Sequence, residues 1–117
     1  MNVLLVFVGG GVGSLIRYAV ALAMKGCGCP WATFAVNILG CFVIGFVSAL
    51  FARTGWNGSF RLMLTVGFCG GFTTFSTFSN ETYQMLVNSQ WLPLVAYLAS
   101  SIVLGLGAVA LGYRLGM

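Results

Sequence analysis

The chain has 117 residues, of which 60% are hydrophobic and only 5% are charged, and its formal net charge is +4. Soluble domains carry about 25% charged residues, so this composition indicates an integral membrane protein. The sequence contains no histidine, and Glu81 is its only carboxylate side chain. These counts exclude paired carboxylates, Ser-His-Asp triads and histidine metal sites within one chain, and we expect no enzyme. The basic residues are scattered singly, which indicates anchoring at the membrane interface rather than a nucleic-acid partner.

Four apolar spans are predicted to cross the lipid bilayer as helices, because each can span about 30 Å of hydrocarbon at about 1.5 Å per residue. They cover residues 3–24, 31–52, 60–87 and 92–113. The short connections predict that consecutive helices are antiparallel neighbours in one all-α transmembrane domain over residues 1–117. Three tryptophans lie at span edges, as an aromatic belt at the interface predicts: Trp31, Trp56 and Trp91.

The third span contains the tract Gly67-Phe68-Cys69-Gly70-Gly71-Phe72-Thr73-Thr74-Phe75-Ser76-Thr77-Phe78-Ser79-Asn80-Glu81. Dense glycines and alternating hydroxyls near the expected midplane predict a helix that is broken near residues 70–74. Irregular backbone at that depth is tolerated only where it is buried in protein or lines a cavity. Carbonyl groups released at a break can bind a small cation. The tract therefore predicts a binding or conduction site for a small ion.

Three phenylalanines follow one another at steps of three in this tract, which would place them near one helical face: Phe72, Phe75 and Phe78. Lipid contact or core packing is the simpler explanation of such a stripe, but the neighbouring hydroxyls of Thr74 and Thr77 weaken it. An aromatic ring has a positive edge. Ring edges that point into a narrow path would favour a small anion, and they would not hold it as tightly as a full positive charge.

The first span contains Arg17, which lies about 10 Å from the end of a helix that rises about 1.5 Å per residue. Its side chain either snorkels or pairs, or it provides a positive charge at a vestibule for anions. Glu81 is expected toward the same side of the membrane, which allows an Arg17–Glu81 pair. Gly9 and Gly13 form a small-xxx-small pair, which predicts close helix packing.

The polar residues of the second span share one helical stripe, because they are separated by steps of four, four and seven: Thr33, Asn37, Cys41 and Ser48. An amide in the membrane indicates either a hydrogen bond between helices or a group that faces a ligand. Asn37 could donate to an anion through its NH2 group and accept from a neighbour. In the fourth span, Tyr97, Ser101 and Gly105 form a similar stripe, and Ser101 is a candidate pore hydroxyl.

Positive charges hardly distinguish the two ends of the predicted bundle. The end with both termini carries Arg53, Arg61 and Arg114. The other end carries Lys25, and Arg17 lies toward that end within the first span. Such a weak positive-inside bias is compatible with insertion both ways up. Two oppositely inserted copies would form a two-fold dimer with its axis in the membrane plane.

The cysteines give little functional signal. Cys41 and Cys69 fall inside predicted helices, where a free cysteine usually serves as a small packing residue. Cys27 and Cys29 lie in the first connection and form only a weak metal motif without further cysteines or histidines.

The sequence resembles the Fluc (CrcB) family of small fluoride channels over all four spans. The resemblance is carried by Gly9-Gly10-x-x-Gly13-x-x-x-Arg17-Tyr18, by Thr33-x-x-x-Asn37-x-x-Gly40-x-Phe42-x-x-Gly45 and by the tract from Gly67 to Phe78. The last motif is highly specific, whereas the fourth span is the least distinctive. Fluoride selectivity rests on this resemblance, because the residues alone indicate only a small anion.

The resemblance implies a passive channel that exports fluoride from the cytoplasm through two pores of an antiparallel, dual-topology homodimer in the cell inner (plasma) membrane. It also implies a structural sodium ion at the dimer centre, held by backbone carbonyls that match Gly70 and Thr73. The pore phenylalanines become Phe75 and Phe78, and the pore amide becomes Asn37. Other positions match the fluoride pathway or its vestibule: Thr77, Tyr97, Ser101 and Arg17.

Two other classes of protein remain as alternatives. A small dual-topology multidrug exporter also has four helices and a similar length, but it needs a carboxylate in the first helix, where this chain has Arg17 and no acid. A structural subunit held together by its glycines would explain the packing motifs. It would leave Asn37 and the Thr/Ser/Phe tract without a purpose.

Overall fold

The computed structural model describes residues 2–27, 30–55 and 58–117, and the regular elements within these ranges are helical. Four spans among them are long and apolar enough to cross a membrane: Asn2–Ala23, Trp31–Thr54, Gly58–Val87 and Trp91–Gly116. These spans indicate a multi-pass membrane protein, as predicted from the composition. The second and fourth spans run past their predicted ends because the helices continue through the terminal arginines Arg53 and Arg114.

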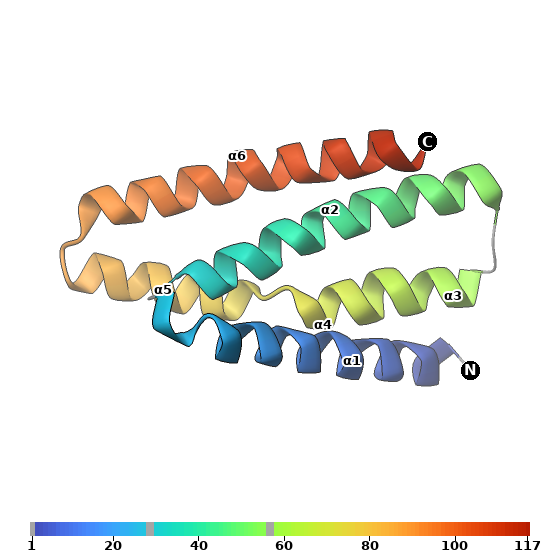
Figure 1. Cartoon of the computed structure of the whole chain (residues 1–117), viewed down its shortest axis with the longest axis horizontal. Coiled ribbons are helices and arrows are strands. Elements are labelled where there is room, and N and C mark those ends of the chain that lie inside the picture. The colour runs from blue at the N-terminus through green and yellow to red at the C-terminus, as the bar shows by residue number, and fades with distance from the viewer. Residues whose placement is uncertain (1, 28–29, 56–57) are drawn as a thin grey trace.

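The third span is assembled from several helical pieces, while the other three spans are single helices. Helix α1 covers Asn2–Ala23, the short 3-10 turn η1 covers Lys25–Cys27, α2 covers Trp31–Thr54 and α6 covers Trp91–Gly116. The third span contains α3 (Gly58–Leu62), a π-helical segment η2 (Met63–Cys69), α4 (Gly70–Phe72) and α5 (Phe75–Val87). Both termini lie at the same end of the bundle (Figure 1), as the four-span topology requires.

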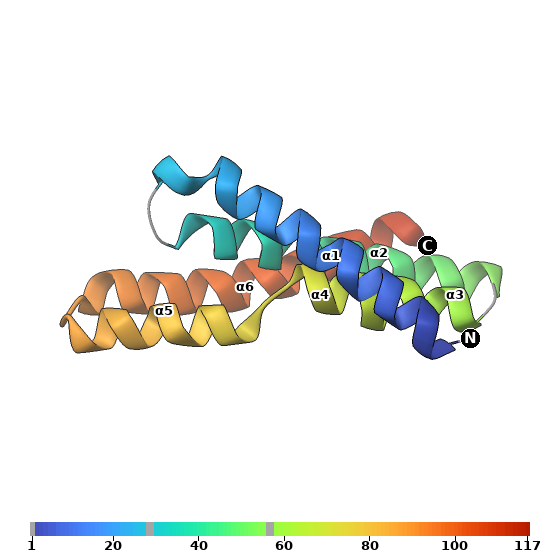
Figure 2. The ribbon, with the colours of Figure 1, turned by 90° about the horizontal axis from the view of Figure 1, so that it is seen from below.

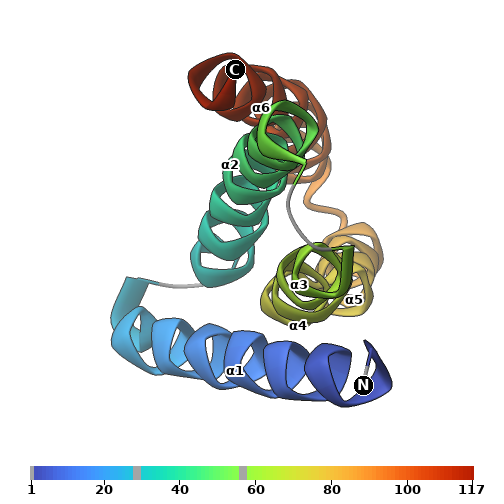
Figure 3. The ribbon, with the colours of Figure 1, turned by 90° about the vertical axis from the view of Figure 1, so that its right-hand side faces the viewer.

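The helices form two packed groups around the third span. Helix α2 packs along α6, and α1 packs against η2 and α4. Helix α1 crosses the rest of the bundle obliquely (Figure 2). In the end-on view of Figure 3, the third span lies between α1 and α6. The buried apolar side chains are contributed by α2, α6 and the third span: Val36, Val47, Ala49, Phe51, Cys69, Phe72, Met85 and Tyr97.

Small residues allow α1 to approach the third span closely. A Cβ atom at Gly13 would overlap the carbonyl oxygen of Phe68 and would lie 2.8 Å from the amide nitrogen of Phe72. A Cβ atom at Gly9 would likewise overlap the carbonyl oxygen of Met63 in η2. The predicted close packing at this small-xxx-small pair is therefore confirmed, and its partner is the third span.

Part of the predicted interface and metal signal falls outside the described residues. Trp31 and Trp91 begin α2 and α6 and are largely exposed, as an aromatic belt requires. Trp56 and Cys29 lie outside the described ranges, as does the side chain of Cys27. The third member of the belt and the weak cysteine motif therefore stay predictions.

We predict that Gly13→Ala lowers the thermal unfolding midpoint in detergent, because the added methyl meets backbone atoms that cannot rotate away. Overpacking of this kind costs about 1–3 kcal/mol. Gly11→Ala is the matched control, since a Cβ atom at Gly11 has no heavy atom within 4 Å. The control should unfold at the wild-type temperature or slightly above it, and equal losses in both variants would contradict the packing.

Candidate functional site

The third span is interrupted at Thr73 and Thr74, where the backbone is extended. Their dihedral angles are φ −88°, ψ 161° for Thr73 and φ −148°, ψ 120° for Thr74. Gly70 is helical, with φ −63° and ψ −38°, and the amide of Thr73 still donates to the carbonyl of Cys69 at 3.0 Å. The glycines therefore belong to the last helical turn. The extended residues are two β-branched threonines, which suit extended backbone better than a helix.

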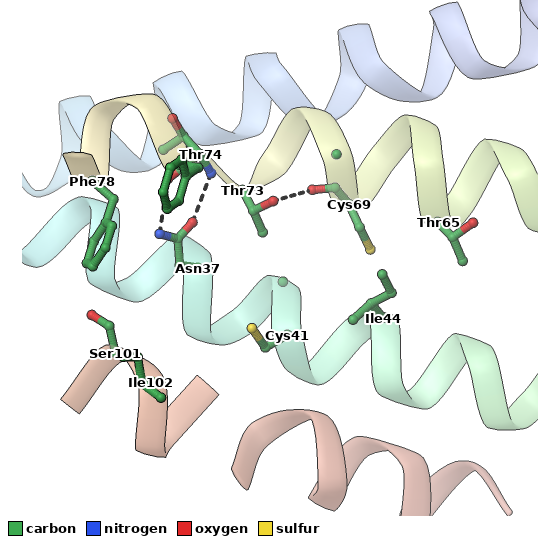
Figure 4. A pocket seen from close by; sticks show the side chains of 13 residues that line it. Asn37, Cys41, Ile44, Thr65, Cys69, Thr73, Thr74, Phe78, Ser101 and Ile102 are labelled. Carbon is green, nitrogen blue, oxygen red and sulfur yellow. Dashed lines mark hydrogen bonds between the residues drawn. The ribbon is translucent and has the colours of Figure 1, made fainter. Parts of the chain in front are cut away.

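Asn37 of α2 pairs with both backbone polar groups of Thr74 (Figure 4). Its Nδ2 donates to the carbonyl oxygen of Thr74 at 3.2 Å, and the amide of Thr74 donates to its Oδ1 at 2.9 Å. An extended residue directs its own N–H and C=O to the same side, as in an antiparallel strand pair, so that one carboxamide reaches both. The side chain thus replaces the helical partners that Thr74 lacks.

Arg17 of α1 binds the backbone at the end of α4. Its Nε donates to the carbonyl oxygen of Gly71 at 3.0 Å, and the hydroxyl of Ser14 lies 3.5 Å from the same oxygen. In a continuous helix this carbonyl would accept from the amide of Phe75. A cation is also favoured at a helix C-terminus, which carries a negative partial charge. Arg17 therefore contacts the interrupted backbone, rather than the Glu81 carboxylate that the helix directions also allowed.

Glu81 connects three helices through hydrogen bonds to its carboxylate. Thr33 Oγ1 of α2 donates to Oε2 at 3.0 Å, and the hydroxyl of Tyr97 in α6 donates to Oε1 at 2.9 Å. The sequence indicated Glu81 only as a possible partner of Arg17, and the hydrogen bonds from Thr33 and Tyr97 were not predicted. The available signal was helical spacing, because Thr33 lies one turn before Asn37 and Glu81 one turn after Thr77.

The structure contradicts the predicted stripe at Phe72 only, because the rings of Phe75 and Phe78 are neighbours with centroids 6.1 Å apart and line the same cavity. Phe72 is only 5% exposed and stacks on Phe68, with ring centroids 5.6 Å apart. Phe75 is 79% exposed, whereas Phe78 packs edge-on against Tyr97 with centroids 4.9 Å apart. The extended backbone at residues 73–74 changes the direction of the side chains that follow it.

A cavity of about 460 Å³ lies beside the interruption, and it brings together most of the predicted site residues (Figure 4). The predicted residues in its lining are Asn37, Gly70, Thr73, Phe75, Phe78 and Ser101. Cys41 and Cys69, which are both free thiols, also line it. The close-up shows Asn37 and Cys41 on α2 opposite the interrupted span, with Ser101 on α6.

The remaining predicted residues line other cavities of the single chain. Arg17 and Thr77 line a cavity of about 270 Å³ toward α1, and Thr74 belongs to the lining of both this cavity and the larger one. Tyr97 lines a third cavity of about 410 Å³ together with Phe34. Thr74 thus lies between two groups of predicted pathway residues. Tyr97 contacts the ring of Phe78 and donates a hydrogen bond to Glu81.

Gly70 and Thr73 both lose the amide that would pair with their carbonyl in a continuous helix. The amide of Thr74 donates to Asn37, and the amide of Thr77 donates to Thr74 Oγ1 at 3.2 Å. The space at Gly70 is open, since a Cβ atom there would meet no heavy atom within 4 Å. Released carbonyl oxygens are suitable ligands for a small cation, so these two residues fit a sodium site.

A family model and two relatives of known name relate this chain to the same family. The family described as CrcB-like protein, Camphor Resistance (CrcB), matches residues 4–113. A protein of Phocaeicola vulgatus named fluoride-specific ion channel FluC is 49% identical over 114 residues, which cover 95% of this chain and 94% of that protein. A protein of Chlorobaculum tepidum with the same name is 50% identical over 114 residues, which cover 95% of this chain and 90% of that protein. Both relatives are named as ion channels rather than enzymes.

We predict that the Tyr97–Glu81 hydrogen bond stabilises the fold measurably. Hydrogen bonds to charged groups contribute about 1.5–3 kcal/mol, so Tyr97→Phe should lower the free energy of unfolding by that amount. In a Glu81→Leu background the same change should cost much less, because the acceptor is gone. Tyr113→Phe, at the half-exposed end of α6, should change little in either background. An equal cost of Tyr97→Phe in both backgrounds would show that the hydroxyl acts elsewhere.

Proposed function

This chain belongs to the CrcB-like family, and from that membership we propose that it is a passive, fluoride-selective channel. It is a transport protein rather than an enzyme. In the proposal it exports fluoride from the cytoplasm across the cell inner membrane. The observation that carries the proposal is the interruption at residues 73–74, because hydrogen-bond donors and aromatic rings gather in one cavity beside it.

The proposed anion path passes Asn37, Phe75, Phe78 and Ser101. Fluoride is small and strongly hydrated, so a path that conducts it has to replace water hydrogen bonds. Asn37 gives one Nδ2 hydrogen to Thr74 and has a second one for the cavity, and Ser101 adds a hydroxyl. Ring edges add weaker positive potential. The N-terminus of α5, at Phe75, adds the positive end of a helix dipole.

The proposed vestibule lies on the α1 side of the interruption. Arg17 and Thr77 line the cavity there, and Arg17 is anchored at Gly71. A fixed positive charge at this depth attracts anions, and its backbone hydrogen bond keeps it from entering the path. Tyr97 contributes indirectly, because its ring supports Phe78 and its hydroxyl satisfies the carboxylate of Glu81.

We propose that two copies assemble as an antiparallel, dual-topology homodimer with two pores. In one copy Gly70 and Phe75 are exposed beside a partly polar cavity at the interruption. Lipid offers no partner to released backbone groups, so another protein surface has to cover them. A second copy of the chain supplies such a surface, and the weak charge bias is compatible with its opposite insertion.

The dimer proposal also accounts for a structural sodium ion. Gly70 and Thr73 of each copy would hold it with carbonyl oxygens, at the negative end of the α4 dipole. Two carbonyls from one chain are an incomplete set, whereas two copies would supply four. When bound, the ion supplies a positive charge that balances carbonyl dipoles from both copies.

Fluoride efflux from liposomes that contain the purified protein tests the proposed function. We expect rapid efflux down the fluoride gradient, little chloride efflux and no dependence on a proton gradient. A multidrug exporter would instead exchange protons for a cationic drug, and a structural subunit would transport neither. Absence of fluoride efflux from well-inserted dimers would reject the channel.

We predict that Phe75→Ile and Phe78→Ile each slow fluoride efflux about tenfold or more while the dimer survives. Each tenfold loss corresponds to about 1.4 kcal/mol of barrier, a plausible size for removing ring-edge contacts. Phe7→Ile is a matched control, because Phe7 is 76% exposed on α1 and does not line the cavity. Efflux at the wild-type rate in both cavity variants would contradict the proposal that these ring edges stabilise fluoride along its path.

A further inference from the structure

We propose that Asn37 is the positioning residue of the cation site: its pairing with Thr74 is what releases the carbonyl of Gly70. This inference rests on the proposed function, since it takes the sodium site as given and assigns it a control residue. Asn37 is thereby more than a donor in the anion path. Its amide group determines whether a helical carbonyl four residues before Thr74 is available to an ion.

Two acceptors compete for the amide hydrogen of Thr74. The amide of Thr74 can donate to the Gly70 carbonyl, as in a continuous helix, or to Asn37 Oδ1, as in this structure at 2.9 Å. The second bond, from Nδ2 to the Thr74 carbonyl at 3.2 Å, is formed only if Thr74 is extended. The two bonds together therefore favour the conformation in which Gly70 loses its amide partner.

The packing of α2 supports the same role. Gly40 lies three residues after Asn37 and so on the same side of α2. A Cβ atom at Gly40 would overlap Cγ2 of Thr73. Helix α2 thus meets the two extended residues at consecutive contacts, Gly40 with Thr73 and Asn37 with Thr74. This close approach places the carboxamide within reach of the backbone.

The released carbonyl of Gly71 differs from that of Gly70, because it already has a partner. Gly71 O accepts from Arg17, so a cation side chain already occupies it. Gly70 has no such partner from α1, and it lines the cavity that Asn37 also lines. Without Asn37, the backbone could extend α4 by one residue and recapture the Gly70 carbonyl. The cation site would then lose one oxygen from each copy.

The test measures the thermal unfolding midpoint of the purified protein against sodium concentration, with a large organic cation keeping the ionic strength constant. The wild-type midpoint should rise with sodium and saturate. In Asn37→Ala, the sodium concentration at half-saturation should increase about tenfold or more, or saturation should disappear. A residue with a purely structural role would lower the midpoint equally at every sodium concentration and leave half-saturation unchanged.

Thr33→Val is the matched control, because Thr33 lies on the same stripe of α2 and loses one hydrogen bond of its own, to Glu81. It should unfold at lower temperature with the wild-type half-saturation. Asn37→Ser is the second variant if the alanine protein does not fold, since its hydroxyl is too short for both bonds, and the same shift is expected.

The outcomes separate this inference from the proposed function. A sodium response in the wild type with unchanged half-saturation in both Asn37 variants would overturn the positioning role and leave the sodium site standing. A wild type that is indifferent to sodium would reject the sodium site of the proposed channel, and the inference with it. A shift confined to the Asn37 variants supports the assignment.

Discussion

Hydrocarbon offers no hydrogen bonds, so each polar backbone group inside a membrane needs a partner from the protein, and the rest of this structure depends on that constraint. The extended residues Thr73 and Thr74 break the helical pattern in the third span. Their neighbours are then satisfied by side chains: Asn37 pairs with Thr74, Arg17 binds Gly71, and the hydroxyl of Thr74 caps α5. These partners come from α1, α2 and the third span itself, so the interruption also determines how those helices pack.

The interruption brings two helix ends of opposite polarity to the same depth. The end of α4 carries the negative pole of a helix dipole, and the start of α5 carries the positive pole. In the proposed channel a cation lies at the first pole and an anion passes the second. One pair of extended residues can thus serve two ions of opposite charge without any ionised side chain in the path. Asn37 is hydrogen-bonded to Thr74 of this pair and belongs to the wall of the cavity, which links the two sites.

Much of the fold follows from the sequence, because a bilayer allows few solutions. Span length predicted four membrane helices, and the Gly9–Gly13 spacing predicted the close approach of α1. The direction of the side chains after the interruption could not be predicted, because it depends on partners far along the chain. Helical periodicity placed Phe72 on one face with Phe75 and Phe78, whereas the structure buries Phe72 and leaves Phe75 exposed beside Phe78. The hydroxyl groups that donate to the Glu81 carboxylate were not predicted for the same reason, since they come from α2 and α6.

In the proposed channel, fluoride moves passively along a path beside the interrupted helix. The most direct measurement is the reversal potential of the current through the protein in a planar bilayer, with different fluoride concentrations on the two sides. A passive fluoride channel should give reversal at the equilibrium potential of fluoride, with no change when a pH gradient or a chloride gradient is added. A reversal potential that followed the proton or chloride gradient would contradict it.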